Sequence, residues 1–333
     1  MKVFVTGATG FVGGHLIDAL HAKKIEHLGL ARSLKKWEEF NLPGKPLTGN
    51  LEDLQKGALE SWINELPDDL THVVHTAGAI HTFNDETFKR VNLEATKDLF
   101  YALKKKYPKL HFVFVSSLAS IGPSDNSSER DEASPLAPVS EYGKSKKSAE
   151  NFLIAEKPLE WSLSIIRPPM VIGPRDPAIL DVFKMVKGRF IFGNGLEGPD
   201  KLYSFVCVYD LITLIEKVLE RDHRRVEIFL SAYPSNHTFR EITETIAKLM
   251  NLKTFSIPIP FPLISGLANT IAAMNKLVNI DIRLTPDKIK ELKPNAWTCS
   301  GKKSEEVLKM NYEWDLKKTL TTTLEDYLSR GWL

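Results

Sequence analysis

The sequence predicts an α/β protein in which a doubly wound parallel sheet is followed by a smaller, mixed domain. Short apolar runs of strand character alternate in the first half of the chain with segments of helical periodicity. A glycine-rich turn directly follows the first of these runs. The length of 333 residues suits about two domains, and a hydrophobic content of 43% supplies a sizeable core.

The first strand is expected at residues 2–6, and a glycine turn follows it. Gly7, Gly10 and Gly13 stand three apart, and apolar residues at helical spacing follow over residues 11–20. This order brings backbone N–H groups and the positive end of a helix to one point, where a pyrophosphate can bind. Gly7 would allow the tight turn, Gly10 the approach of the phosphates, and Gly13 the close packing of helix on strand. A dinucleotide site is therefore predicted, against the alternative of an ordinary glycine turn.

The glycine spacing resembles that of the extended short-chain dehydrogenase/reductases, the NAD(P)-dependent epimerase/dehydratase family. The resemblance implies a Rossmann-type dinucleotide-binding domain over residues 1–170 and a mainly substrate-binding domain over residues 171–333. Segments around residues 203–232 are expected to return to the first domain or its edge. The resemblance also implies dinucleotide contacts from Gly7, Thr9, Gly10, Phe11, Val12, Gly13, Asn50, Leu51, Thr76, Ala77, Gly78, Asn92 and Pro168.

The cofactor preference is predicted by the segment after the second expected strand, residues 26–31. An NAD-preferring site usually has an acid here that accepts hydrogen bonds from the ribose hydroxyls. This chain has Arg32 instead, with Lys35 and Lys36 close behind. A guanidinium suits a 2′-phosphate, which a carboxylate would repel, so Arg32 and Lys36 predict NADP(H). The alternative is a solvated basic loop.

The catalytic residues are expected after the apolar run at residues 110–117 and on the helix that follows residue 140. Tyr142 and Lys146 are four residues apart and therefore share one helix face. A free phenol has a pKa of about 10. We expect the Lys146 ammonium, together with the positively charged nicotinamide ring, to lower the pKa of Tyr142 towards neutral pH. The resemblance implies that Ser117 orients the substrate oxygen, that Tyr142 transfers the proton, and that Tyr142 and Lys146 also contact the cofactor. A packing role for the Tyr/Lys pair is the alternative.

Two departures from the nucleotide-sugar members of this family indicate a less charged substrate. Those members commonly have Asn where this chain has Met170 and Arg where it has Tyr203, and both groups contact the diphosphate of their substrates. Their absence predicts a lipophilic or weakly charged substrate. Residues 255–280 form a stretch of very low charge with helical periodicity. This stretch is interpreted as core packing, with a gate over the site or a shallow membrane contact as the alternatives.

Together these features predict an NADP(H)-dependent oxidoreductase that interconverts a secondary alcohol and a ketone, and the C-terminal pattern resembles the 3β-hydroxysteroid dehydrogenase-like reductases. A nucleotide-sugar epimerase with tightly held NAD(P) and a non-catalytic NADP-sensing protein are the two alternatives. The net charge of +2 argues against a nucleic-acid partner, and neither a metal site nor a membrane span is expected. Cys207 and Cys299 cannot form a disulfide framework, which predicts a cytoplasmic protein. A homodimer is expected from the resemblance.

Overall fold

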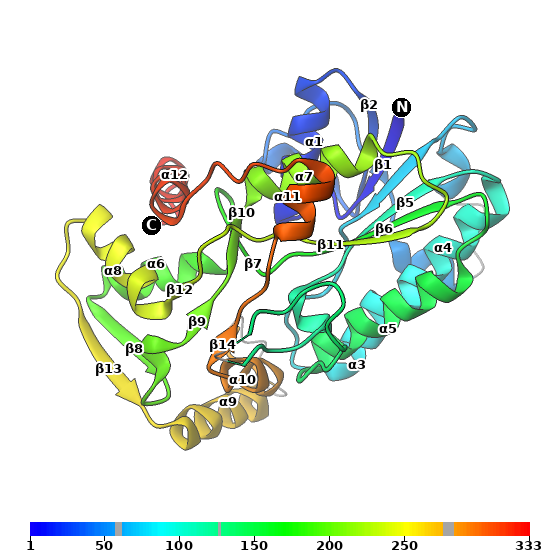
Figure 1. The fold of residues 1–333 in the computed structure, drawn as a ribbon. Coiled ribbons are helices and arrows are strands. Elements are labelled where there is room, and N and C mark those ends of the chain that lie inside the picture. Colours follow the sequence, from blue (N-terminus) through cyan, green and yellow to red (C-terminus); the bar gives the residue numbers. More distant parts are fainter. Residues whose placement is uncertain (57–61, 126–127, 276–282) are drawn as a thin grey trace.

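The computed structural model describes residues 1–56, 62–125, 128–275 and 283–333. Among them the largest element is a seven-stranded sheet, in which neighbouring strands are parallel (Figure 1). Its strands are β1 (Lys2–Thr6), β2 (Glu26–Ala31), β3 (Leu47–Thr48), β4 (His72–His75), β5 (His111–Val115), β6 (Ser162–Arg167) and β11 (Val226–Leu230). Their order is β11-β6-β5-β4-β1-β2-β3, so the chain order reverses between β1 and β4. The predicted doubly wound α/β fold is confirmed.

Helices pack on both faces of this sheet because successive side chains of a strand point to opposite sides. They are α1 (Phe11–Ala22), α2 (Leu34–Glu39), α3 (Asp85–Phe88), α4 (Ala95–Lys106), α5 (Glu141–Glu156), α7 (Val208–Leu219) and α11 (Lys302–Leu308). Val3 and Val5 of β1 are buried in one apolar cluster with residues of α1 and α7. Phe4, which lies between them, is buried in a second cluster with residues of α4 and α5. Burial on both faces explains why the interiors of β1 and β5 are continuously apolar.

Most of the C-terminal half forms a smaller assembly of helices and short sheets (Figure 1). Its strands are β7 (Met170–Ile172), β8 (Phe190–Asn194), β9 (Leu202–Tyr203), β10 (Phe205–Cys207), β12 (His237–Thr238), β13 (Phe255–Ile259) and β14 (Ala296–Trp297). Its helices are α6 (Ile179–Lys187), α8 (Phe239–Leu249), α9 (Phe261–Asn275), α10 (Pro286–Leu292) and α12 (Leu316–Ser329). β11 leaves this half and pairs with β6 of the large sheet, within the segment expected to return. In the part of the chain that the structure describes, no helix is long and apolar enough to cross a membrane.

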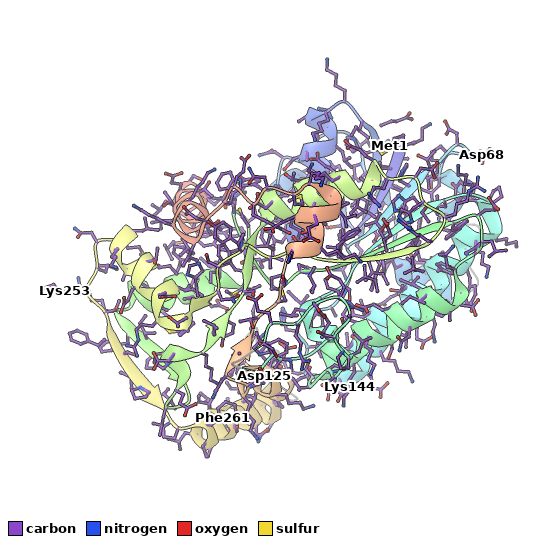
Figure 2. The ribbon with its side chains drawn as sticks, in the orientation of Figure 1. Met1, Asp68, Asp125, Lys144, Lys253 and Phe261 are labelled. Atoms are coloured by element: carbon purple, nitrogen blue, oxygen red, sulfur yellow. The ribbon has the colours of Figure 1, made fainter. Side chains whose placement is uncertain are left out.

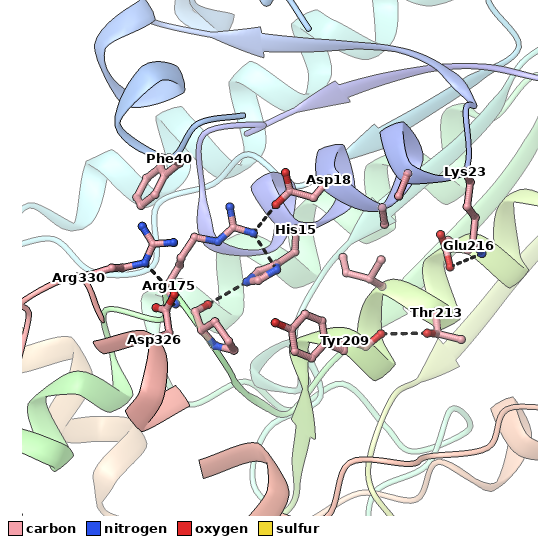
Figure 3. A pocket seen from close by; sticks show the side chains of 14 residues that line it. His15, Asp18, Lys23, Phe40, Arg175, Tyr209, Thr213, Glu216, Asp326 and Arg330 are labelled. Atoms are coloured by element: carbon pink, nitrogen blue, oxygen red, sulfur yellow. Dashed lines mark hydrogen bonds and ion pairs between the residues drawn. The ribbon is translucent and has the colours of Figure 1, made fainter. Parts of the chain in front are cut away.

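A cluster of ion pairs joins the C-terminal helix α12 to α1 beside a cavity of about 620 Å³ (Figure 3). The Arg175 guanidinium donates to Asp18 Oδ2 at 2.6 Å, and the Arg175 backbone N–H donates to Asp326 Oδ2 at 2.8 Å. The other charged pairs in the lining are Lys23–Glu216 and Arg330–Asp326. Since these charges are already paired, we interpret the cluster as a link between the two halves.

His75, at the end of β4, is completely buried beneath the carboxyl edge of the large sheet. Its Nδ1 lies 2.6 Å from Thr6 Oγ1, and its Nε2 lies 2.9 Å from Thr96 Oγ1. Burial lowers the pKa of His75 to about 3. The histidine is therefore neutral and structural, as its position in an apolar run suggests. Burial also lowers the pKa values of His15, His72 and His111, to between about 3 and about 4.

We expect the stability of the fold to decrease in mild acid because His75 takes up a proton only after unfolding. Between pH 6.5 and about 3 the unfolded chain binds more protons at this residue, so the stability is complete above pH 6.5 and is lost as the pH falls. For one such histidine the loss between pH 7 and pH 5 is about 2 kcal/mol. Urea denaturation of the native protein and of His75→Gln at both pH values tests this. An equal pH dependence in the two proteins would contradict the role given to His75.

Candidate active site

The glycine turn between β1 and α1 leaves its outer side open. Gly7 has a φ of +69°, and a Cβ there would lie 2.7 Å from Thr76 Oγ1. A Cβ on Gly13 would lie 2.2 Å from the carbonyl oxygen of Gly7, so the helix packs against the turn as predicted. A Cβ on Gly10 would meet only that same carbonyl oxygen, at 3.0 Å. No side chain caps the N-terminus of α1, and this open backbone cradle fits a diphosphate. Thr9, Phe11 and Val12 are partly buried around it.

The cationic segment after β2 lies at the same edge of the sheet. Val5 of β1 pairs with Gly29 of β2, so Arg32 follows its strand close to the level at which the glycine turn follows β1. Arg32, Lys35 and Lys36 are exposed, and their side chains make no hydrogen bond or ion pair with any residue that the structure describes. These three side chains are therefore available to bind an anionic group.

The turn after β3 uses its polar groups internally. Asn50 Oδ1 accepts a hydrogen bond from the N–H of Glu52 at 3.3 Å, and the N–H of Asn50 donates to Asp53 Oδ2 at 3.1 Å. Leu51 is buried. Asn50 therefore shapes the turn at which an adenine contact was expected. Only its Nδ2 group is left for a contact with the cofactor.

The loop after β4 is held by Thr76 and Asn92. Thr76 Oγ1 donates to the carbonyl oxygen of Thr6 at 2.7 Å, which ties β4 to β1. Asn92 Oδ1 accepts from the N–H of Ala79 at 2.7 Å, and its Nδ2 donates to the Ala79 carbonyl oxygen at 2.9 Å and to Ser145 Oγ at 3.0 Å. Because the buried Asn92 amide is occupied by these contacts, it supports the loop and α5. The adjacent Ala77 and Gly78 present their backbone at the same edge.

Ser117, Tyr142 and Lys146 come together at the carboxyl end of β5. Lys146 Nζ is buried and donates to the carbonyl oxygen of Val115 at 3.0 Å. A Cβ on Gly78 would lie 3.3 Å from that ammonium, so Lys146 reaches the loop after β4. Burial lowers the pKa of Lys146 to about 8. The Ser117 hydroxyl is close enough to the Tyr142 phenol to lower the pKa of that phenol. The carbonyl oxygen of Pro168 accepts from the N–H of Leu118, next to Ser117.

The surroundings of Tyr142 in the chain alone raise the pKa of its phenol. Burial raises the pKa of Tyr142 above its ordinary value, Ser117 lowers it in part, and Glu291 raises it further. The Tyr142 ring also packs against Phe88, with 5.9 Å between the ring centroids. In the chain alone, the ammonium is directed at the Val115 carbonyl and does not offset the effect of burial on this pKa. The predicted lowering by Lys146 together with the nicotinamide ring stays a prediction.

A buried ion pair beneath this site was not predicted. Glu150 and Arg167 are 0% and 2% exposed, and Arg167 Nη2 donates to Glu150 Oε2 at 2.6 Å. Glu150 Oε1 also accepts from Ser120 Oγ at 2.8 Å and from Ser116 Oγ. The two serines flank Ser117, so Glu150 joins its loop to α5. Glu150 and Arg167 lie 17 residues apart on different elements, so no local spacing could have revealed this contact.

The N-terminus of α5 is held by a helix from the other end of the chain. Asp287 Oδ1 accepts from the N–H of Glu141 at 2.7 Å, and its Oδ2 accepts from the N–H of Tyr142 at 3.1 Å. Ser140 Oγ, the N-cap of α5, donates to Glu291 Oε1 at 2.7 Å. Both acids belong to α10, so the half expected to bind the substrate contacts the helix that carries Tyr142. Nothing in the spacing of these residues could have shown this.

The comparisons with known proteins decide the family. The model of the NAD dependent epimerase/dehydratase family matches residues 3–229. The chain belongs to this family. The family's oxidoreductase chemistry makes the protein an NAD(P)-dependent enzyme of the extended short-chain dehydrogenase/reductase type.

Relatives within the family include enzymes named for lipid substrates. A ceramide reductase from Caulobacter vibrioides is 26% identical, over 99% of this chain and 96% of the relative. A sterol-4-alpha-carboxylate 3-dehydrogenase (decarboxylating) from Dictyostelium discoideum is 29% identical, over 65% of this chain and 68% of the relative. The predicted resemblance to 3β-hydroxysteroid dehydrogenase-like enzymes is confirmed.

Solved structures of the epimerase/dehydratase family share the fold. A UDP-glucose 4-epimerase from Thermus thermophilus, solved with NAD, has a TM-score of 0.79 at 21% identity, and the match covers 98% of this chain and 99% of that one. The two chains therefore have the same architecture from end to end, and the likeness concerns the fold alone.

Proposed function

We propose that this enzyme is an NADP(H)-dependent oxidoreductase that interconverts a ketone and a secondary alcohol. The observation that carries the proposal is the convergence of Ser117, Tyr142 and Lys146 beside the open glycine cradle, all at the carboxyl edge of one parallel sheet. In open α/β sheets this edge is where ligands bind. Oxidation of NADPH, followed by its absorbance with a panel of ketones, steroids and nucleotide sugars, tests the proposal.

Ser117, Tyr142 and Lys146 have different roles in the reduction of the substrate carbonyl. A bound nicotinamide supplies the hydride for the carbonyl carbon. Tyr142 donates its phenolic proton to the oxygen as negative charge develops there. Ser117 donates a hydrogen bond to the same oxygen and orients it. Lys146, whose ammonium lies between Val115 and the loop after β4, would hold the ribose hydroxyls of the bound cofactor.

The protonation state of Tyr142 suits the role of a proton donor. Burial raises the pKa of this phenol, so a proton is present for donation throughout the neutral range. Transfer in the opposite direction needs a phenolate, which this environment disfavours. Tyr142 can therefore serve as the proton donor in ketone reduction.

The preference for NADP(H) is supported by three cationic side chains without partners in the described chain, those of Arg32, Lys35 and Lys36. Arg32→Glu should raise the KM for NADPH by about 10- to 100-fold, because a charge-assisted hydrogen bond contributes about 1.5–3 kcal/mol. The KM for NADH should change little. Steady-state kinetics with both cofactors measures this.

Lys24→Glu is the matched control for that prediction. Lys24 is also exposed, but it precedes β2, at the opposite edge of the sheet from the glycine turn. Its substitution should leave both KM values unchanged. An unaltered KM for NADPH in Arg32→Glu, or a native preference for NADH, would exclude the assignment.

A lipophilic or weakly charged substrate is supported by two kinds of observation. Met170 and Tyr203 occupy the positions where nucleotide-sugar enzymes have groups for a diphosphate. The ceramide reductase and the sterol dehydrogenase, by their names, act on lipids, and the first of them matches almost the whole chain. Long-chain ketones should therefore be reduced in preference to nucleotide sugars.

A nucleotide-sugar epimerase is the competing function, and its support is the fold shared with the Thermus thermophilus enzyme. An epimerase returns the hydride within each cycle, so sustained net consumption of NADPH excludes it. A cofactor-sensing protein without turnover is excluded by the same result. A homodimer and a cytoplasmic location stay predictions, for sedimentation velocity and cell fractionation to test.

A further inference from the structure

The two-stranded sheet of β8 and β13 carries an exposed apolar face. Along β8, Ile191 is buried, whereas Phe190 and Phe192 are each about half exposed and point to the other side. β13 runs parallel to β8, with Phe255 opposite Phe190 and Ile257 opposite Phe192. Paired residues of neighbouring strands share a face. Four large apolar side chains therefore form one block, in which the Phe190 and Phe255 ring centroids are 6.5 Å apart.

Helix α9 extends this apolar face along the chain. It begins two residues after β13 ends, and none of its 15 residues is charged. Leu263, Leu267 and Met274 are spaced by four and seven residues, so they share one side of the helix, and each is more than half exposed. Ile264 and Ala268 are buried on another side. The interpretation of residues 255–280 as core is therefore wrong for these exposed side chains; residues 276–280 lie outside the described chain.

The exposed apolar side chains of these three elements and of the turn after β8 together form what we call the apolar surface. They are Phe190, Phe192, Leu196, Phe255, Ile257, Leu263, Leu267 and Met274. β8, β13 and α9 lie at the end of the molecule remote from the large sheet (Figure 1). Figure 2 shows Lys253 and Phe261 at this end, with Asp68 at the opposite one. Eight large apolar side chains exposed on neighbouring elements are unusual unless they bind something.

Two segments that lead into the apolar surface carry only positive charges, and the exposed acids Asp181, Glu197 and Glu244 directly flank these segments. Residues 182–196 and 245–275 contain no Asp or Glu. Five exposed cations lie in these two segments, immediately before or close to the starts of β8 and β13. Their side chains make no ion pair or hydrogen bond with any residue in the described ranges. They are Lys184, Lys187, Arg189, Lys248 and Lys253.

We propose that the apolar surface and these five cations dock the enzyme on the anionic face of a lipid bilayer. Apolar side chains beside unpaired cations are the combination that binds a membrane interface, where the former enter the acyl boundary and the latter meet lipid phosphates. A second copy of the chain fits less well, because a two-fold contact would bring two identical cationic clusters together. The docking concerns where the enzyme is held and stands independently of the ketone reductase proposal.

Flotation of the purified full chain with vesicles tests this docking. Vesicles of phosphatidylcholine alone are compared with vesicles that also contain phosphatidylglycerol. We expect the native protein to float with the anionic vesicles and to be released by high salt. Lys187→Glu combined with Lys253→Glu, and separately Phe255→Ser combined with Leu267→Ser, should each lower the partition coefficient at least about tenfold.

Leu159→Ser is the control variant, since Leu159 is 87% exposed and lies after α5, outside the apolar surface. It should float like the native protein. All substituted side chains are exposed, and the charge reversals test the docking even if the apolar variant folds poorly. The proposal is overturned if the native protein floats with neither type of vesicle, or if Leu159→Ser lowers vesicle binding as much as the other variants do. It is also overturned if the native protein binds no vesicles and the substitutions in the apolar surface instead abolish a dimer in sedimentation velocity. Flotation needs no turnover, so it fails or succeeds separately from the catalytic assignment.

Discussion

Replacing Tyr142 with Phe should lower kcat for ketone reduction at least about a thousandfold, because the proton donor is lost. The remaining ring can keep its contact with Phe88, so the fold should be retained. Since the glycine cradle and the Arg32 segment are untouched, the Kd for NADPH should change less than about threefold. Stopped turnover with intact cofactor binding, measured by absorbance and by NADPH fluorescence, is the expected pair of results.

Tyr101→Phe is the matched control for this substitution. Tyr101 is an exposed tyrosine of α4, and its ring packs against Phe152, which lies ten residues after Tyr142 on α5. It should retain full activity. More than a tenth of the native kcat in Tyr142→Phe would contradict the assignment of Tyr142 as proton donor. Lost NADPH binding in that variant would mean that the defect is structural.

Replacing Glu150 with Leu should destabilise the protein by about 3–5 kcal/mol, since it leaves the buried Arg167 guanidinium without its counter-charge. One nitrogen of that guanidinium, Nη1, already lacks a hydrogen-bond partner in the described residues. The melting temperature should fall by about 5–10 °C. Because Ser116 and Ser120 also lose their acceptor, the loop that carries Ser117 should loosen and kcat should decrease.

Two comparisons separate the buried pair from a general effect of removing an acid. Glu160→Leu breaks the exposed pair with Arg224 and should change the stability by less than about 0.5 kcal/mol. The double variant Glu150→Leu/Arg167→Met should recover much of the stability lost in the single variant, since no unpaired charge stays buried. A single variant that melts like the native protein would show that the pair does not support the site.

Sequence analysis located those parts of the site whose residues all lie within one short segment of the chain. The positions of Gly7, Gly10 and Gly13 depend on a turn within seven residues, and the structure gives each the space or close approach expected of it. Tyr142 and Lys146 share a helix face by their spacing alone. Such local patterns need no knowledge of the rest of the chain.

The features that were missed depend on contacts between distant segments. Asp287 binds the N–H groups of α5 from 145 residues away, and its neighbours in sequence carry no sign of this contact. The raised pKa of Tyr142 in the chain alone has the same origin, because the phenol is buried beside Phe88 and lies near Glu291 of α10. The apolar character of α9 was noticed, but whether an apolar helix faces the core or the solvent is decided by what the fold places beside it.

The contact between Asp287 and the start of α5 also limits how this enzyme can be re-engineered. The C-terminal half does not behave as an interchangeable cassette, because one of its helices completes the N-terminus of the helix that bears the proton donor. A chimera that takes its substrate-binding half from a relative would change the substrate specificity and, at the same time, the contacts at the N-terminus of α5. Only relatives that have a hydrogen-bond acceptor at the position of Asp287 would preserve the geometry of Tyr142. This single contact therefore determines which substrate-binding halves can be combined with this catalytic half.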